Sequence, residues 1–402
     1  MKEVVILGAG YAGLRALHVL QGSKGDFHIT LVDKNDYHYE ATDLHEVAAG
    51  TQPRERISYD IADVVRPQKT TFLQNEVATI DRQSQRIMFM DQTSLSYDYL
   101  IVALGFESES FGIPGVNENA LEMVDVDSAE TIYHHLLKQM KEYKKTQDPD
   151  LLKIVVCGAG FTGVELLGSL VENRKEFAEI AGVQSEEIKL FCVEAVTRLL
   201  PMFDENLSAY GINNLVKWGV EFLTGKPIKE IKPGVVVYQT DAETGATEEL
   251  SAKTIIWTTG VSGSHVMADS NYAARRGRVM VNQDLSDPEH SNVFVVGDVS
   301  AVMDPATNRP YPTTAQIALK MGYQAAKNCL HLIKGEKTED FHFESLGSVA
   351  SIGNTHAFGL VGKMPVKGYP ASFVKKAIMD RSLFLTGGVK EVLAKGRFDF
   401  YH

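Results

Sequence analysis

The sequence predicts an α/β protein built on two parallel sheets, and three observations carry this prediction. A β-branched run followed by GxGxxG occurs twice, as VVILGAGYAG in Val4–Gly13 and as IVVCGAGFTG in Ile154–Gly163. Each copy continues into a segment of helical character. A second apolar run then ends in an acid, at Asp33 in HITLVD and at Glu194 in IKLFCVE. Repeated units of strand, turn, helix and strand are typical of doubly wound sheets.

The glycines of each copy suit a turn that binds a dinucleotide. In chain order, the three glycines of a copy allow the tight turn, let the backbone approach a pyrophosphate, and let the helix pack on the strand. They are Gly8, Gly10 and Gly13 in the first copy and Gly158, Gly160 and Gly163 in the second. The phosphates would lie at the positive end of the helix dipole. The carboxylates of Asp33 and Glu194 would accept the ribose hydroxyls, and the alternative is that both merely end strands.

Composition excludes several other classes of protein. The chain has 402 residues, 44% of them hydrophobic and 23% charged, which fits a globular chain of two or three domains. A net charge of -12 disfavours a nucleic-acid partner, because duplex binding needs a basic face. The first apolar run is too short for an export signal. The longest uncharged stretch, 345–362, is rich in glycine and serine and makes a poor membrane-spanning helix.

Three further apolar runs end in glycine or in Gly-Asp: DYLIVALG (Asp98–Gly105), TIIWTTG (Thr254–Gly260) and NVFVVGD (Asn292–Asp298). With them the chain resembles the flavoprotein reductases that carry two dinucleotide-binding domains. The resemblance implies that the first GxGxxG holds FAD and the second holds NAD(P)H. It also implies that Asp298 contacts the flavin ribitol and that the backbone of Val77, in EVATID, contacts the adenine.

The resemblance implies a fold of two Rossmann-like dinucleotide-binding domains, of the glutathione-reductase type, plus a C-terminal α+β segment that binds a membrane. We expect an FAD-binding domain from residues 1–115 and 265–335, an inserted NADH-binding domain at 116–264, and a membrane-association region at 336–402. A helix is expected within 120–147, with an apolar stripe on one side, lysines on the other, and Pro149 as its end.

Cysteine usage narrows the class of reductase. Disulfide reductases and sulfide-oxidising relatives need redox thiols, and the first 156 residues contain no cysteine. Cys157 and Cys192 lie in apolar strands, where a thiol usually packs without reacting. The chain has only three cysteines, the third being Cys329, and this sparse, odd number fits a reducing cytoplasm. We therefore expect electrons to pass from the flavin directly to the acceptor.

The nicotinamide cofactor follows from Glu194. Its carboxylate would repel a 2'-phosphate, which favours NADH over NADPH. Arg198, four residues further on, could weaken this preference.

The segment RPYPTTAQIALKMG (Arg309–Gly322) opens a helix, with Thr313 or Thr314 as its N-cap. This segment, YHYEATDLHEVAAGT (Tyr37–Thr51) and GAGFTGVE (Gly158–Glu165) resemble the type II NADH:quinone oxidoreductases. Two glutamines of that family's signature are replaced here by Lys320 and Met321, which leaves the quinone species open.

This resemblance implies site residues. Gln316 would lie between flavin and quinone, Glu165 near the nicotinamide as a proton relay, and Lys375 close to the quinone entrance. Taken alone, Gln316 could make no contact, and Glu165 could simply stabilise its helix. The implied FAD contacts are Gly8, Gly10, Tyr11, Ala12, Gly13, Leu14, Asp33, Lys34, Thr42, Val77, Gly105, Thr162, Asp298 and Ala315. The implied NADH contacts are Gly158, Gly160, Gly163, Glu194 and Gly260, and no metal site is expected.

The C-terminal segment suits a membrane surface. Between Lys363 and Arg397 there are eight basic and two acidic residues, a local charge of +6 that leaves -18 for the rest of the chain. Apolar residues alternate with these charges and continue to Phe398, Phe400 and Tyr401. We expect two short basic amphipathic helices, hinged at Gly387-Gly388, in the plane of the membrane interface. The alternative is a helix docked on the protein itself or on a second copy. Just before this segment, 347–362 indicates a hairpin in which His356 is structural.

The function expected is that of a peripheral flavoenzyme on the cytoplasmic face of the cell membrane. It would pass two electrons from NADH through FAD to a membrane quinone, without proton pumping. One alternative is a soluble NADH-dependent reductase of a small redox protein of the ferredoxin or rubredoxin type, which needs no basic apolar tail. Another is a flavin-bearing binding protein without turnover. A homodimer is possible on this sequence.

Overall fold

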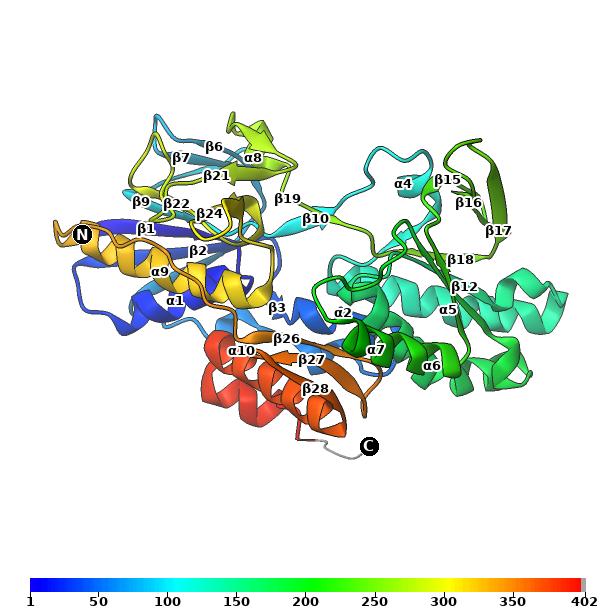
Figure 1. The fold of residues 1–402 in the computed structure, drawn as a ribbon. Coiled ribbons are helices and arrows are strands. Elements are labelled where there is room, and N and C mark those ends of the chain that lie inside the picture. Colours follow the sequence, from blue (N-terminus) through cyan, green and yellow to red (C-terminus); the bar gives the residue numbers. More distant parts are fainter. Residues whose placement is uncertain (399–402) are drawn as a thin grey trace.

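The computed structural model describes residues 1–398 as a chain arranged around two five-stranded parallel sheets (Figure 1). The first sheet has the order β22-β9-β1-β2-β5, with bounds Val293–Val295, Tyr99–Val102, Lys2–Leu7, Phe27–Asp33 and Thr70–Gln74. The second has the order β11-β18-β12-β13-β14, with bounds Leu121–Glu122, Thr254–Trp257, Lys153–Cys157, Lys189–Glu194 and Val220–Thr224. The predicted α/β fold with two parallel sheets is confirmed.

Each glycine-rich turn joins the central strand of its sheet to a helix. In the first sheet β1 leads into α1 (Tyr11–Gly22), and in the second β12 leads into α6 (Phe161–Ala181). The central strands are buried on both faces, which explains why they read as continuous apolar runs. Because β22 comes late in the chain and pairs with β9, the second sheet is inserted between parts of the first. The boundaries near residues 115, 264 and 335 stay a prediction.

Smaller sheets and one long helix accompany the two main sheets. Two three-stranded antiparallel sheets have the bounds Val77–Asp81 (β6), Arg86–Phe89 (β7), Ser94–Ser96 (β8), Ile228–Lys232 (β15), Val235–Gln239 (β16) and Thr247–Ser251 (β17). Between the two main sheets, β10 (Phe106–Ser108) pairs antiparallel with β19 (Val261–Gly263). The helix expected within 120–147 is α5 (Val126–Thr146), and it buries Ile132, Leu136 and Met140. It is therefore a packed helix of the second unit rather than a bare connector.

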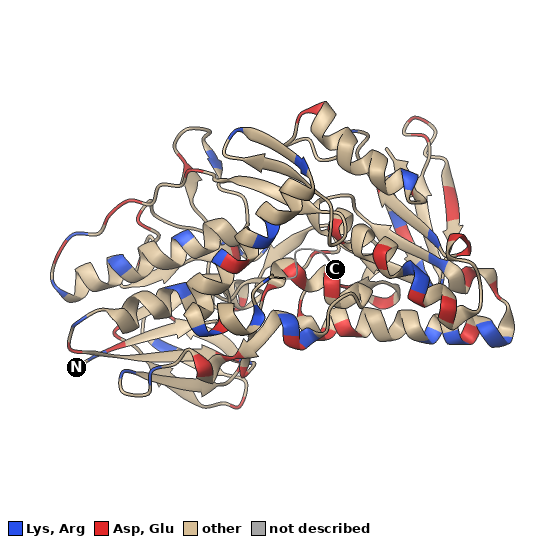
Figure 2. Cartoon of the chain, turned by 90° about the horizontal axis from the view of Figure 1, so that it is seen from below, with Lys and Arg blue, Asp and Glu red and all other residues tan. Residues whose placement is uncertain are grey.

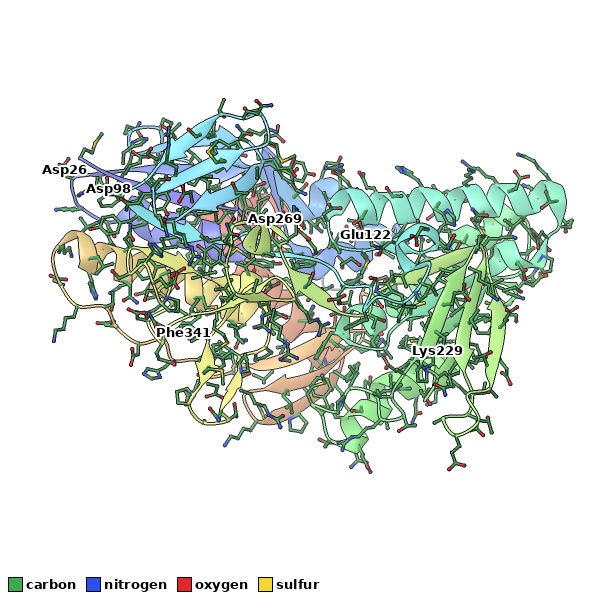
Figure 3. All side chains as sticks on the ribbon, turned by 90° about the horizontal axis from the view of Figure 1, so that it is seen from above. Asp26, Asp98, Glu122, Lys229, Asp269 and Phe341 are labelled. Carbon is green, nitrogen blue, oxygen red and sulfur yellow. The ribbon has the colours of Figure 1, made fainter. Side chains whose placement is uncertain are left out.

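The C-terminal region starts after α9 (Ala315–Ile333). Phe341, labelled in Figure 3, is fully buried and packs edge-on against Tyr311, which fixes the path of the chain beyond α9. The predicted hairpin is confirmed as β26 (Gly347–Ser351) and β27 (Ala357–Val361), and β28 (Met364–Gly368) adds a third strand. His356 packs against the rings of Trp218 and Tyr369, in agreement with a structural role.

The last element is α10 (Tyr369–Lys395), which packs on the β26–β28 sheet and on α1 (Figure 1). Its backbone is interrupted at Gly388, where φ is 77° and ψ is -169°. The structure therefore has two helical halves hinged at the predicted Gly387-Gly388 pair. Phe400 and Tyr401 lie outside the described residues. Within residues 1–398 no helix is both long enough and apolar enough to cross a membrane.

Candidate functional site

The two glycine-rich turns leave room for a ligand at the start of α1 and of α6. Gly8 has φ +97°, and a Cβ there would lie 2.2 Å from the carbonyl oxygen of Ala103, so only glycine fits the turn. By contrast, a Cβ on Gly10 or Gly160 would meet no atom within 4 Å. Open space beside a helix N-terminus is what a pyrophosphate needs, so both turns fit a dinucleotide.

The two acids at the strand ends face these turns. Asp33 accepts hydrogen bonds from the backbone of Ala9 (2.6 Å) and Asn35 (2.8 Å). Glu194 accepts from the backbone of Ala159 (2.7 Å) and Val196 (3.0 Å). The two units therefore repeat the same arrangement. Each carboxylate keeps lone pairs that can accept ribose hydroxyls.

Asp298 lies after β22, in a short turn beside α1 and α9. Among residues 1–398 its carboxylate has no hydrogen-bond donor, and burial raises its pKa to about 6, against the lowering effect of nearby Arg278. A partly buried carboxylate without a donor suits a hydroxyl-bearing ligand such as the FAD ribitol. The first unit therefore fits FAD by two independent features, the open glycine turn and this carboxylate.

The remaining residues implied as FAD contacts come from several elements. Tyr11 and Thr42 touch each other, with 3.2 Å between the Tyr11 hydroxyl and Thr42 Oγ1. Ala12 and Leu14 are buried in α1, Val77 is buried in β6, and Lys34 is exposed beside Asp33.

Ala315 is the first residue of α9, and Thr314 is its N-cap as predicted, accepting from Ile317 N at 3.3 Å. Gly105 and Gly260 have φ values of +70° and +75°. Their roles stay predictions.

Glu165 and Lys375, which are 210 positions apart in the chain, form a buried ion pair. The distance between Lys375 Nζ and Glu165 Oε1 is 2.8 Å, and the two side chains are 11% and 8% exposed. The same carboxylate oxygen accepts from Ser351 N (3.0 Å) and from the Ser351 hydroxyl (3.1 Å). α6, α10 and the end of β26 therefore meet at one carboxylate.

Gln316 lies at the other end of β26. Its Oε1 accepts from Leu346 N at 2.9 Å, and its Nε2 approaches the Gly347 carbonyl at 3.5 Å. The three residues predicted as catalytic are thus arranged along one strand, with Gln316 at its start and Glu165 and Lys375 at its end. Lys320 is exposed on α9, and Met321 is buried against the Ser300 hydroxyl.

Electrostatics keep the buried pair charged. Burial alone would raise the pKa of Glu165, but Lys375 and His45 hold it below its ordinary value. Burial alone would lower the pKa of Lys375, but Glu165 and Asp43 raise it. His45, which hydrogen-bonds Ser169 at 2.9 Å, has its pKa lowered by burial. The pair is therefore an ammonium and a carboxylate at neutral pH.

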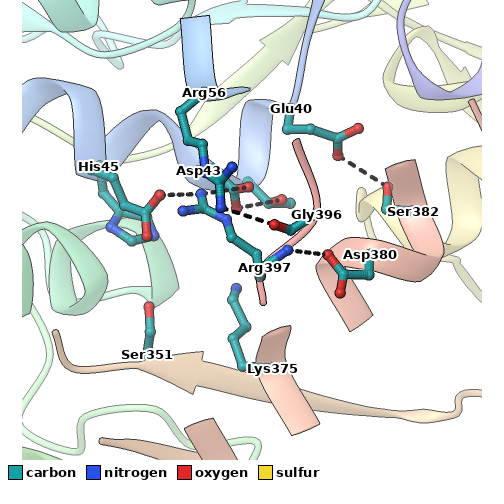
Figure 4. A network of polar contacts seen from close by, with 12 residues as sticks. Glu40, Asp43, His45, Arg56, Ser351, Lys375, Asp380, Ser382, Gly396 and Arg397 are labelled. Atoms are coloured by element: carbon teal, nitrogen blue, oxygen red, sulfur yellow. Dashed lines mark hydrogen bonds and ion pairs between the residues drawn. The ribbon is translucent and has the colours of Figure 1, made fainter. Parts of the chain in front are cut away.

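A second group of buried charges adjoins this pair, and no sequence pattern indicated it. Arg397 forms ion pairs with Asp43, at 3.4 Å, and with Glu46 (Figure 4). The Arg397 backbone N donates to Asp380 at 2.6 Å. Asp43 and Glu46 stand in the segment YHYEATDLHEVAAGT, and their partner is more than 300 positions away. No local pattern could have joined them.

The cysteines are placed as predicted. Cys157 and Cys192 are buried in β12 and β13, Cys329 is buried in α9, and all three are free thiols. Burial raises the pKa of each thiol. They are packing groups, since the reactive form of cysteine is the thiolate.

The basic residues of the C-terminal segment do not all lie at the surface. Lys375, Lys376 and Arg397 are buried, and two of them neutralise buried acids: Lys375 pairs with Glu165, and Arg397 pairs with Asp43 and Glu46. Lys390 is exposed but pairs with Asp63 at 2.5 Å. Basic and acidic residues are interleaved over the whole chain rather than gathered in one block (Figure 2).

The outward side of α10 is apolar instead. Phe373 is 58% exposed, Ile378 43%, Phe384 51%, Val389 61% and Leu393 74%. The inward side carries Ser372, Lys375, Lys376, Ser382 and Thr386 beside a few apolar residues. α10 is thus docked on the protein, as the alternative reading expected, but it turns large apolar side chains to the outside.

Comparison with known proteins agrees with this geometry. Residues 2–322 match the family model described as pyridine nucleotide-disulphide oxidoreductase. The chain belongs to this class of two-dinucleotide oxidoreductases.

Within that class the relatives are specific. The type II NADH:quinone oxidoreductases of Staphylococcus aureus are 40% identical over 401 residues, covering 99% of both chains. This chain is therefore a member of the type II NADH:quinone oxidoreductase family.

Solved structures share the fold. NDH2 from Plasmodium falciparum in complex with NADH matches with a TM-score of 0.85 at 19% identity, covering both chains completely. The sulfide:quinone oxidoreductase of Aquifex aeolicus matches with a TM-score of 0.78 at 21% identity, covering 100% of this chain and 96% of that one. At these identities the likeness establishes the fold.

Replacement of Asp298 tests the flavin site. We expect Asp298→Ala to weaken FAD binding about 10- to 100-fold, because charge-assisted hydrogen bonds contribute about 1.5–3 kcal/mol. The flavin absorbance that stays with the protein after gel filtration measures this loss. Asp304→Ala, at a partly exposed acid a few residues further on, is the matched control and should keep its flavin. Equal flavin content in the two variants would contradict the assignment.

Proposed function

We propose that this chain oxidises NADH by way of a bound FAD and passes two electrons to a membrane quinone, without proton pumping. One observation carries the proposal, namely that Gln316, Glu165 and Lys375 lie along β26, where both dinucleotide units and the C-terminal region meet. Membership in the type II NADH:quinone oxidoreductase family supports it. A soluble reductase of a ferredoxin or rubredoxin would have no use for the apolar side of α10.

The residues of the first unit hold the flavin. The open turn at Gly10 takes the pyrophosphate, Asp33 takes the ribose, and Asp298 takes the ribitol. Bound there, FAD supplies hydride acceptance from NADH and electron delivery to the quinone. Ala315, at the start of α9, would contact the flavin, and Thr162, at the start of α6, would line the contact between nicotinamide and flavin.

The residues along β26 orient the quinone and manage protons. Gln316 bonds to Leu346 and Gly347, which hold its amide in one orientation, and in this proposal it would lie between flavin and quinone. Lys375 is a cation whose charge is maintained by Glu165, and it stabilises negative charge that develops on a quinone oxygen. Glu165 in turn borders the nicotinamide side through α6. Lys320 and Met321 are not among the residues that line β26. The quinone species is to be identified with the panel of quinones described below.

The membrane contact is the outward side of α10. Five large apolar side chains in two hinged halves insert into the acyl boundary, and exposed Lys363, Lys367 and Arg381 meet lipid headgroups. Because three basic residues are buried, apolar burial provides most of the binding energy. The location proposed is peripheral, on the cytoplasmic face of the cell membrane. A homodimer is compatible with this arrangement.

Two half-reactions test the function directly. Mixing the flavin-loaded enzyme with NADH should bleach the flavin absorbance in a stopped-flow instrument, and a quinone added next should restore it. A panel of quinones in reconstituted membranes should then define the acceptor. Failure to bleach would exclude an NADH-dependent reductase, and bleaching without reoxidation by any quinone would exclude the acceptor class.

Glu194 determines the choice of NADH. Glu194→Gln removes both the repulsion of a 2'-phosphate and a charged acceptor for the ribose, so the ratio of kcat/KM for NADH over NADPH should fall about 10- to 100-fold. Arg198 donates to the Phe203 carbonyl at 3.3 Å and is thus turned into its own loop. Arg198→Ala should leave the ratio nearly unchanged. An unaltered ratio in Glu194→Gln would refute the assignment.

Substitutions on the outward side of α10 test the membrane contact. Each large apolar side chain buried in lipid contributes about 1.5–3 kcal/mol, so Phe373→Ser, Ile378→Ser and Phe384→Ser together should weaken vesicle binding more than about 100-fold. Sedimentation with anionic phospholipid vesicles measures this effect. Activity with a water-soluble quinone should survive.

Two exposed apolar residues on other elements serve as a control. Met90→Ser and Val216→Ser remove side chains that are 65% and 50% exposed, and they should not affect vesicle binding. If the α10 triple variant binds vesicles as well as this control does, the membrane contact lies elsewhere.

A further inference from the structure

The two glycine-rich turns differ in how the residue between their first two glycines is held. In the second turn the backbone N of Ala159 donates to Glu194 at 2.7 Å. In the first turn the backbone N of Ala9 donates to Asp33 at 2.6 Å, and the carbonyl oxygen of Ala9 also lies 2.7 Å from Nδ1 of His38. Within residues 1–398 the carbonyl of Ala159 has no side-chain partner of this kind. The first turn is therefore held on both sides of its central residue, and the second on one side only.

His38 is placed to hold the Ala9 carbonyl firmly. It lies in β3 (Tyr37–Tyr39), and both His38 and Ala9 are 2% exposed, so water does not compete for the bond. Because a carbonyl oxygen only accepts, Nδ1 of His38 carries the hydrogen. Without this donor the buried carbonyl would have no partner, and a buried hydrogen bond is costly to lose for that reason.

The bond to the Ala9 carbonyl determines where the next amide points. Ala9 C=O and Gly10 N–H belong to one peptide unit, and in a planar trans peptide the two groups point in opposite directions. With the carbonyl turned to His38, the Gly10 N–H is turned away from it. Gly10 is the N-cap of α1, and a Cβ there would meet no atom within 4 Å. An amide fixed in direction at an open helix start is what a pyrophosphate binds.

The ring of His38 is itself fixed by neighbours on several elements. It packs against the ring of Tyr59, with 4.9 Å between the centroids, and edge-on against Tyr11 at 5.8 Å. Its Nε2 lies 3.5 Å from a carboxylate oxygen of buried Glu40. Glu40 in turn accepts from the hydroxyl of Ser382, on α10, at 3.1 Å. The ring is thus held between the flavin turn and a carboxylate that the C-terminal helix contacts.

Holding a binding turn in its final shape increases affinity, because less conformational freedom is lost when the ligand binds. A turn held on both sides should therefore release a dinucleotide more slowly than a turn held on one side. The proposed function requires this difference, since FAD stays bound through many turnovers whereas NADH is exchanged in each one.

We propose that His38 is a positioning residue of the flavin site. Through the Ala9 carbonyl it aligns the Gly10 amide with the FAD pyrophosphate, and it thereby makes the first turn the one that retains its dinucleotide. This inference rests on the proposed function, which assigns FAD to the first turn and NADH to the second.

Three replacements of His38 separate this role from packing. The side-chain amide N of asparagine takes the position of Nδ1 of histidine, whereas that of glutamine takes the position of Nε2. His38→Asn should therefore keep the bond to Ala9, and His38→Gln and His38→Leu should lose it. Size alone predicts the reverse order, since glutamine and leucine fill the buried site better than asparagine does.

The readout is the release of flavin from the holoenzyme. Loaded enzyme is diluted into buffer without FAD, and the fluorescence of free flavin gives the rate of release. His38→Gln and His38→Leu should release flavin about 10- to 100-fold faster than the wild type, and His38→Asn should stay within about threefold of it, because only the first two leave the carbonyl without a donor. The Kd of NADH, obtained from the concentration dependence of flavin bleaching in the loaded fraction, should be unchanged in all three.

His28→Leu is the matched control. His28 is a partly exposed histidine of β2 that hydrogen-bonds the Thr71 hydroxyl at 2.9 Å. Its replacement should leave the rate of flavin release at the wild-type value.

Two results would overturn the proposal. Release at the wild-type rate from His38→Gln and His38→Leu would show that the bond to Ala9 does not retain the flavin. Faster release from His38→Asn than from His38→Gln would show that size matters rather than the donor at Nδ1, and this comparison holds even if His38→Leu does not fold.

Failure of the proposed function gives a different pattern. In that case the wild-type enzyme would retain no FAD on gel filtration, or NADH would not bleach it. A wild-type enzyme that retains FAD and is bleached by NADH, together with His38 variants that release flavin no faster, would refute this inference alone.

Discussion

The buried ion pair between Glu165 and Lys375 is the interaction on which the site depends. Removing two charges from water costs several kcal/mol for each ion, and a pair repays that cost only with good geometry and further hydrogen bonds. Ser351 supplies those bonds from the end of β26. The pair therefore fixes the C-terminal helix relative to the helix that follows the second glycine turn, and it places β26 between them.

The same constraint determines the outer surface of α10. Because Lys375, Lys376 and Ser382 face inward, large apolar residues make up much of what the helix turns outward. If α10 instead packed its apolar side against the core, the carboxylates of Glu165 and Asp43 would lose the counter-charges that Lys375 and Arg397 provide. The polar interior and the apolar exterior of α10 are two results of one requirement, so the candidate site and the proposed membrane contact are structurally linked.

Sequence patterns predicted what is local and missed what is distant. The strands, the glycine turns, the Thr314 cap and the Gly388 hinge each depend on a few neighbouring residues, and the structure has them all. The pairing of Lys375 with Glu165, and of Arg397 with Asp43, joins residues hundreds of positions apart. Lysine and arginine are ordinarily solvated, so a count of charges placed these side chains outside. Only the fold shows that they neutralise buried acids.

The arrangement also explains how one cluster can serve both substrates. Glu165 belongs to the helix that begins at the second glycine turn, whereas Lys375 belongs to α10, the helix that we propose as the membrane contact. Charge brought to the start of α6 by a dinucleotide acts on Glu165 through a medium of low dielectric constant, where such interactions are strong. Any change in Glu165 alters the charge environment of Lys375 and, beyond it, of Asp43. In the proposed function, this one buried carboxylate therefore connects the dinucleotide turn of α6 with the cation of α10.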